Sequence, residues 1–316
     1  MYDYLKKGIS LLLLYGISLN LAAQQYGYVQ YNSESGAPFS EVNTVLHDEE
    51  GFVWIGSQNG LYKFDGIHFD LFSIHTESQS IHQIHSNKNR LFFVNDKGLY
   101  EIEDLTHQPQ LDVLLEGSIK ATDTLPFYPN DFILATDETV WMSQSNHSIG
   151  RWQDGIFKTY HFSLSPKEQT LSIQEDDKGH IWVLSPLDGL FLFDESSDSF
   201  EKKSDIKNGH VLLLHKDQLI IGNEALHLYS IANERLKWIK TIPLENDLVT
   251  AIHPDQNDQY YVGTTNGHLF KIKDLYSPPQ IIYGANEAHR VEKLDFGHIK
   301  EIYITQTALA ITISSG

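Results

Sequence analysis

Short apolar segments separated by polar turns run along the whole chain after residue 40. In the clearest stretch, residues 42–66, an apolar segment leads into an acidic turn, a segment through Trp54, a glycine turn and a third segment through Tyr62. Segments of four to six residues rich in β-branched and aromatic side chains predict strands. Helical periodicity is missing after residue 23, so we predict an all-β fold.

The same pattern recurs, most clearly at residues 171–194 and in outline five more times. The aromatic or large apolar residue of the second segment falls at positions 54, 92, 141, 182, 220, 261 and 303. A spacing near forty residues, filled with short strands, is the size of one four-stranded propeller blade. Seven copies therefore predict a seven-bladed β-propeller that forms a single domain over residues 24–316.

A fourth strand follows the three shared segments in six copies and is lacking in the seventh. These fourth strands are expected at 69–72, 111–115, 157–161, 200–203, 236–241 and 281–283. The strand-like segment 27–31 has no copy before it, and pairing it with the last blade would close the ring and remove exposed strand edges. We therefore expect the N-terminal strand to complete the seventh blade.

Residues 1–23 differ in character from the rest of the chain. Lys6 and Lys7 precede an apolar run from Ile9 to Leu21, and small residues follow it up to Ala23. This order is typical of a secretory signal peptide cleaved near Ala23, and the run is short for a membrane helix, which needs about 20 residues. We expect a periplasmic or secreted mature chain with no membrane span.

The composition of the chain excludes some classes of partner and of chemistry. The formal net charge of −19 repels nucleic-acid phosphates and anionic membrane surfaces, so nucleic acid is not an expected partner. The chain has no cysteine, which excludes disulfides, thiolate metal sites and cysteine nucleophiles.

Residues 42–66, with an acidic turn, then Trp-Ile-Gly and then Gly-Leu-Tyr-x-Phe-Asp-Gly, resemble the two-component regulator propeller repeat. The run-in over residues 31–38 is similar to the lead before the first blade in such proteins. The resemblance implies the periplasmic sensor propeller of a hybrid two-component system or sensor histidine kinase of Bacteroidetes type, frequently for a glycan breakdown product. The second propeller, β-sandwich, membrane helix, kinase core and DNA-binding module of that family are absent from this sequence. We therefore expect this chain alone not to signal across a membrane.

Residue types that suggest chemistry have simpler explanations in the repeat. Trp54, Trp141 and Trp182 recur at one position of the period and are expected to pack between blades. The acidic turns lack the alternating oxygen ligands of a calcium loop. His82 and His85 would point to opposite faces of a strand, so no metal site and no cofactor are expected. The sequence leaves open the alternative of catalytic carboxylates that meet across the central channel, because residue spacing cannot reveal them.

Propellers usually bind ligands on one face, where the turns between second and third strands converge with the connections between blades. Amide, hydroxyl and carboxylate groups in those turns suit a polar small molecule such as an oligosaccharide. The candidate ligand-binding residues are Ser57, Gln58, Asn59, Gln144, Asn146, Asp188, Asn223, Glu224, Thr265 and Asn266. The competing explanation is that turns are polar whatever they bind.

We interpret the chain as an extracytoplasmic sensor or ligand-binding propeller without catalysis of its own, whose protein partner could be a membrane-bound kinase. The alternatives are a secreted propeller enzyme, of the polysaccharide lyase or glycosidase type, and a protein-binding scaffold. Fold alone does not choose among them.

Overall fold

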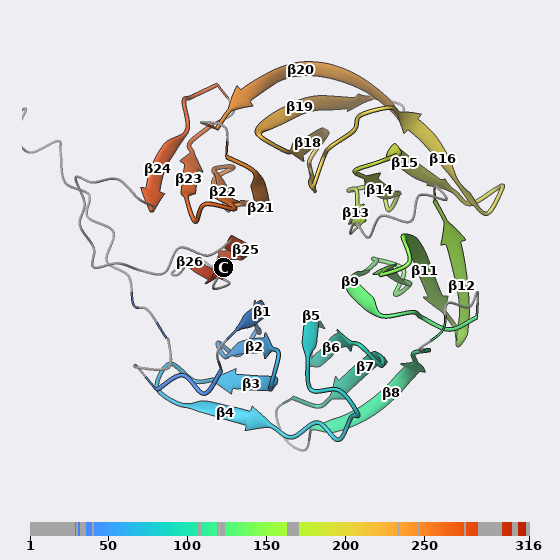
Figure 1. Cartoon of the computed structure of the whole chain (residues 1–316), viewed down its shortest axis with the longest axis vertical. Coiled ribbons are helices and arrows are strands. Elements are labelled where there is room, and N and C mark those ends of the chain that lie inside the picture. Colours follow the sequence, from blue (N-terminus) through green and yellow to red (C-terminus); the bar gives the residue numbers. More distant parts are fainter. Residues whose placement is uncertain are drawn as a thin grey trace, which may run out of the picture.

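A computed structural model describes residues 29, 31, 36–39, 41–105, 109–118, 120, 124–162, 171–232, 234–244, 247–274, 276–283, 299–304 and 309–313. Every regular element that these residues form is a β-strand, as the sequence predicts. The strands form antiparallel sheets arranged around a ring (Figure 1). The expected signal peptide, its cleavage site and the domain boundary at residue 24 lie outside the described residues.

Six blades of four strands make up most of the ring that the described residues form. The first blade contains β1 (Val42–His47), β2 (Val53–Ser57), β3 (Gly60–Phe64) and β4 (Phe69–Phe72). The second contains β5 (Ile81–Asn87), β6 (Arg90–Asn95), β7 (Gly98–Glu103) and β8 (Gln110–Glu116). The third contains β9 (Pro129–Leu134), β10 (Val140–Gln144), β11 (Ser148–Gln153) and β12 (Ile156–His161).

The fourth blade contains β13 (Ser172–Glu175), β14 (Ile181–Ser185), β15 (Gly189–Asp194) and β16 (Ser199–Ser204). The fifth contains β17 (Val211–His215), β18 (Gln218–Gly222), β19 (Ala225–Ala232) and β20 (Arg235–Pro243). The sixth contains β21 (Val249–Pro254), β22 (Tyr260–Thr264), β23 (Leu269–Ile272) and β24 (Gln280–Tyr283). In each blade neighbouring strands pair in sequence order, with the first strand innermost and the fourth at the rim (Figure 1). All six expected fourth strands are present.

The prediction of seven blades is wrong. Within the described residues, the seventh copy of the repeat contributes β25 (Ile299–Ile304) and β26 (Leu309–Ile313), a two-stranded sheet between β21 of the sixth blade and β1 of the first (Figure 1). The expected closing strand at 27–31 falls mostly outside the described residues, and neither Val29 nor Tyr31 lies in a strand. The Tyr31 ring instead packs edge-on against Phe64 and Phe69 of the first blade, at 5.1 and 5.5 Å between centroids. A recurrence of the sequence pattern therefore does not by itself predict a four-stranded blade.

The acidic turn of the repeat has a structural role. The Asp48 Oδ1 atom accepts hydrogen bonds from the backbone N–H of Glu50 (3.0 Å) and Phe52 (2.9 Å), while Oδ2 accepts one from Trp54 Nε1 at 2.9 Å. Asp176 repeats this arrangement with Trp182 Nε1 at 3.0 Å. One carboxylate thus closes the hairpin turn and satisfies the indole of the buried tryptophan six residues later.

The apolar core lies between adjacent blades. Trp54, from the first blade, belongs to one cluster with Ile84 and Phe93 of the second. Trp182, from the fourth blade, clusters with Leu212 of the fifth. Trp54, Trp141 and Trp182 are at most 1% exposed, which confirms the expectation that they pack in the core rather than stack on a ligand. In the part of the chain that the structure describes, no helix could span a membrane.

Candidate functional site

The ten candidate residues all lie in or beside the turns that join second to third strands: β2–β3, β10–β11, β14–β15, β18–β19 and β22–β23. Because each blade is an up-and-down meander, these turns lie on the face that also carries the connections between blades. Backbone hydrogen bonds join the two sets: Val249 N–H donates to Asn223 O at 2.7 Å, and Thr265 N–H donates to Leu248 O at 2.9 Å. We call this surface the turn face.

Two of the ten candidates are buried, and their side chains form hydrogen bonds within the protein. Ser57 is fully buried, and its hydroxyl lies 2.8 Å from both Asn59 Oδ1 and Gly60 O. Gln144 is 1% exposed, accepts a hydrogen bond from Phe127 N at 2.6 Å and donates one to Ser148 Oγ at 2.9 Å. The other eight are exposed or partly exposed, so a ligand could reach them. Their role in binding stays a prediction.

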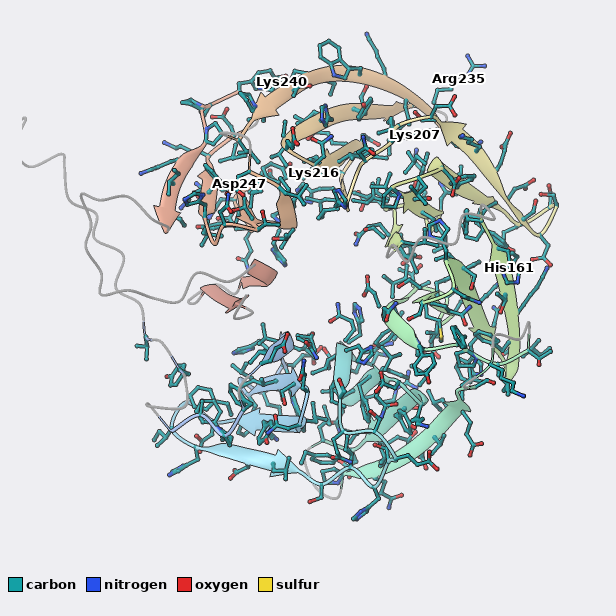
Figure 2. The ribbon with its side chains drawn as sticks, viewed as in Figure 1. His161, Lys207, Lys216, Arg235, Lys240 and Asp247 are labelled. Atoms are coloured by element: carbon teal, nitrogen blue, oxygen red, sulfur yellow. The ribbon has the colours of Figure 1, made fainter. Side chains whose placement is uncertain are left out.

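The turn face also holds a buried carboxylate that was not among the candidates. Asp247, labelled in Figure 2, is 2% exposed and follows β20 in the connection to the sixth blade. It accepts hydrogen bonds from Thr264 Oγ1 at 2.6 Å and Thr265 Oγ1 at 3.2 Å, and lies 2.7 Å from His268 Nδ1. Since Asp247 can only accept, His268 donates from Nδ1, which orients its ring. Sequence spacing could not find this contact, because Asp247 comes before the blade and outside its turns.

A second histidine–carboxylate contact joins two blades. His147, in the β10–β11 turn, is 4% exposed, and its Nε2 atom lies 3.2 Å from Asp188 Oδ2 and 3.2 Å from Ser185 Oγ. The fully buried Ser185 hydroxyl donates to Asp188 Oδ2 at 3.0 Å and accepts the Asp188 backbone N–H at 3.0 Å. Of the candidates, Asp188 is therefore the one whose carboxylate is held by buried polar side chains of two blades.

Asp188 also lines a cavity between the third and fourth blades. The cavity has a volume of about 420 Å³, within the roughly 300–1,000 Å³ common for small-ligand sites. Its walls come from the end of β12, where Figure 2 labels His161, and from β15 and β16. The lining residues are Tyr160, His161, Phe162, Asp188, Phe191, Ser199, Phe200 and Lys202.

Two inner strands, β5 and β9, each carry a titratable group whose pKa is shifted by burial. Burial raises the pKa of Asp131, on β9, to about 6, although hydrogen bonds from the Phe132 backbone and the Gln83 side chain oppose the rise. Burial lowers the pKa of His85, on β5, to about 4. The His85 ring packs on Phe132 at 4.7 Å between centroids.

The described residues include no group of three or more His, Asp or Glu side chains arranged to hold a metal ion. His82 lies 2.9 Å from Asp96 Oδ1, while His85 packs against Phe132. The two histidines singled out by their spacing thus have different partners.

Comparison with solved structures finds the same fold in the extracellular domains of two bacterial signalling proteins. It is similar to the extracellular domain of the hybrid two-component system protein BT4673 from B. thetaiotaomicron, with 20% identity and a TM-score of 0.70 over 93% of this chain and 39% of that one. The corresponding domain of BT3049 from the same organism gives 18% identity and a TM-score of 0.68 over 91% and 41%. These neighbours are of the propeller sensor type that the repeat resembles.

A streptogramin B lyase also shares the fold, with 12% identity and a TM-score of 0.68 over 89% of this chain and 93% of that one. No protein-family model matches the chain, and no curated protein matches its sequence. The chain spans about two fifths of the length of the two extracellular domains. At these identities the likeness concerns the fold.

Proposed function

We propose that this chain is an extracytoplasmic ligand-binding propeller of a two-component signalling system, and that it recognises a polar small molecule such as an oligosaccharide on the turn face. The observation that carries the proposal is the turn face itself, where polar turns and inter-blade connections are held by hydrogen bonds and where Asp188 lines a cavity of ligand size. Preorganised polar groups beside an apolar cavity favour selective binding of a small molecule. The likeness to extracellular sensor domains supports the same function.

In this proposal the chain binds and does not catalyse. Signalling then requires a partner or further domains, and a membrane-bound kinase is the partner that the fold neighbours suggest. Export through the expected signal peptide, with cleavage near Ala23, fits the same location.

A thermal-shift screen against neutral, acidic and basic oligosaccharides and other polar metabolites tests this function. A ligand that binds only the folded protein raises its melting temperature in a saturable way. Each mixture is then analysed for cleavage products by chromatography. Saturable stabilisation without turnover is expected. Turnover of any compound would instead show that the chain is an enzyme. If no compound in the screen raises the melting temperature, small-molecule sensing is refuted.

A further inference from the structure

The rim of the fifth blade is basic, although the chain as a whole has a net charge of −19. Its fourth strand, β20, contains Arg235, Lys237 and Lys240 and no carboxylate. Figure 2 labels Arg235 and Lys240 along this outermost strand. Within the described residues none of the three forms an ion pair, whereas Lys203 on the neighbouring β16 pairs with Glu234 at 3.0 Å. The positive charge of β20 is therefore available to a partner.

A β-bulge brings the three basic side chains to one face of the strand. Before the bulge Lys237 pairs with Ser230 of β19, and after it Lys240 pairs with Leu228. Residues two apart on a strand point to the same face, and so do directly opposite residues of paired strands. Without the bulge, Lys240 would lie on the face opposite to Lys237. Arg235, Lys237 and Lys240 thus form one row, which we call the basic edge.

The outer side of β20 is open to a further strand. β20 ends its sheet and pairs only with β19 in the described part of the chain. At nine residues it is the longest of the six fourth strands. Alternate N–H and C=O groups of an edge strand point outward, and an extended peptide can pair with them. The strand therefore offers backbone hydrogen bonds as well as charge.

An exposed tryptophan lies on the other face of the same strand. Trp238 pairs with Tyr229 of β19 and is 59% exposed. Tryptophan and arginine are the residue types most enriched among the side chains that dominate binding at protein interfaces. A side chain on an added strand would pack against the indole as cross-strand neighbours do. Both faces of β20 therefore carry groups that suit a protein partner.

The charge of the basic edge selects the kind of strand that can pair with it. Lysine and a bulge on an edge strand hinder pairing with a strand of like charge. Carboxylates directly opposite the basic side chains would be stabilising instead. Because Ser230 and Leu228 are two residues apart on β19, the basic row keeps the spacing of about 7 Å that separates alternate residues of a strand. An added strand with carboxylates at alternate positions matches this row.

We propose that the basic edge docks an extended acidic segment of a partner protein, which adds a strand to the fifth blade with its carboxylates opposite Arg235, Lys237 and Lys240. The inference goes beyond the proposed function, because it concerns protein docking at the rim and not small-molecule binding on the turn face. Either can therefore fail without the other.

Fluorescence anisotropy tests the docking with a labelled ten-residue peptide in which glutamate alternates with valine and threonine. Two comparison peptides keep its composition and charge: one has its glutamates contiguous, and the other has methylated backbone nitrogens that cannot donate to β20. The alternating peptide is expected to bind about tenfold more tightly than either, since only it matches both the charges and the backbone. Its affinity should fall as the salt concentration rises.

Charge reversal locates the peptide on the protein. Arg235→Glu and Lys237→Glu should each weaken the Kd about tenfold, because an attraction becomes a repulsion. Both side chains are exposed, and circular dichroism monitors the fold of the variants. The matched control is Lys178→Glu, which makes the same charge change at an exposed turn of the fourth blade and should alter the Kd by less than about twofold.

Each other outcome overturns the assignment. Equal binding of the contiguous or methylated peptide would show attraction by charge alone and refute strand addition. Single-stranded DNA that competes as well as the alternating peptide would make the edge a general polyanion site. Self-association that Lys237→Glu abolishes in sedimentation experiments would assign the edge to a second copy of the chain. If the alternating peptide does not bind, or if Lys178→Glu weakens it as much as Lys237→Glu, the basic edge is not its docking site.

Discussion

Replacing Asp176 with alanine perturbs the turn and the core at once. The carboxylate accepts hydrogen bonds from the backbone N–H of Lys178 (3.0 Å) and His180 (2.9 Å) and from Trp182 Nε1 (3.0 Å). The Trp182 side chain is fully buried, so its indole N–H would lose its partner without gaining water, at a cost of about 1–3 kcal/mol. The two backbone donors lie at a turn that water reaches, and losing them costs about 0.5 kcal/mol each. We expect Asp176→Ala to lower the free energy of unfolding by about 2–4 kcal/mol.

Urea denaturation followed by tryptophan fluorescence measures this loss. Asp177→Ala, in the same turn at an exposed position, is the control and should change stability by less than about 0.5 kcal/mol. Trp182→Phe should cost less in the Asp176→Ala background than in the native chain, because the indole donor is then already unpaired. Equal costs in both backgrounds would refute the coupling between carboxylate and indole.

The pH dependence gives an independent check. Burial raises the pKa of Asp176, but hydrogen bonds from Trp182 and His180 outweigh it and hold the pKa below its usual range. A carboxyl whose pKa is lower in the folded state stabilises fully above the unfolded value, about 3.9, and loses that contribution as the pH falls through the folded value. The stability difference between native and Asp176→Ala proteins should therefore shrink as the pH falls below about 4. A difference that grows in acid would contradict the assigned hydrogen bonds.

Other substitutions test the channel and a tight turn. Because burial raises the pKa of Asp131 to about 6, its charge opposes folding above that pH, and Asp131→Asn should raise stability to urea at pH 8 but not at pH 4. His85, whose pKa burial lowers to about 4, should lose its contribution as the pH falls from about 6.5 to 4, and His85→Gln should flatten the urea-measured stability profile over that window. Gly189→Ala should cost more than 2 kcal/mol in the same assay, because φ is +105° and a Cβ would collide with the Ser204 carbonyl oxygen. Gly155→Ala, with φ of +76° and open space around the position, should cost about 1 kcal/mol.

The sequence predicted the blades well because each is specified locally. An acidic turn, a glycine turn and alternating apolar positions determine three strands within about 25 residues, and Trp54 shows by its burial that the repeat position was interpreted correctly. The number of blades was overestimated because the aromatic position near residue 303 marks a copy, whereas a blade also depends on a fourth strand and on partners distant in sequence.

The candidate site was predicted only in part, for a related reason. Turn positions can be found from strand spacing, and the second-to-third-strand turns lie where the spacing predicts them, while their role in binding stays a prediction. Contacts between blades cannot be found in this way. His147 and Asp188 lie 41 residues apart, and neither spacing nor composition indicates that their side chains meet. Likewise, no local signal distinguished the buried Ser57 hydroxyl from the exposed Asn59 amide.

The two-stranded sheet of β25 and β26 has a mechanical consequence. β25 contacts β21, which is near it in sequence, and β1, which lies at the opposite end of the described chain. Adjacent blades elsewhere are also joined through the backbone. Between β1 and β25, which are neighbours in the ring but distant in sequence, the structure shows non-covalent contacts. A force that pulls the first and sixth blades apart would therefore act on the contacts between β1 and β25. We expect the ring to open at these contacts while the strands within each blade stay paired.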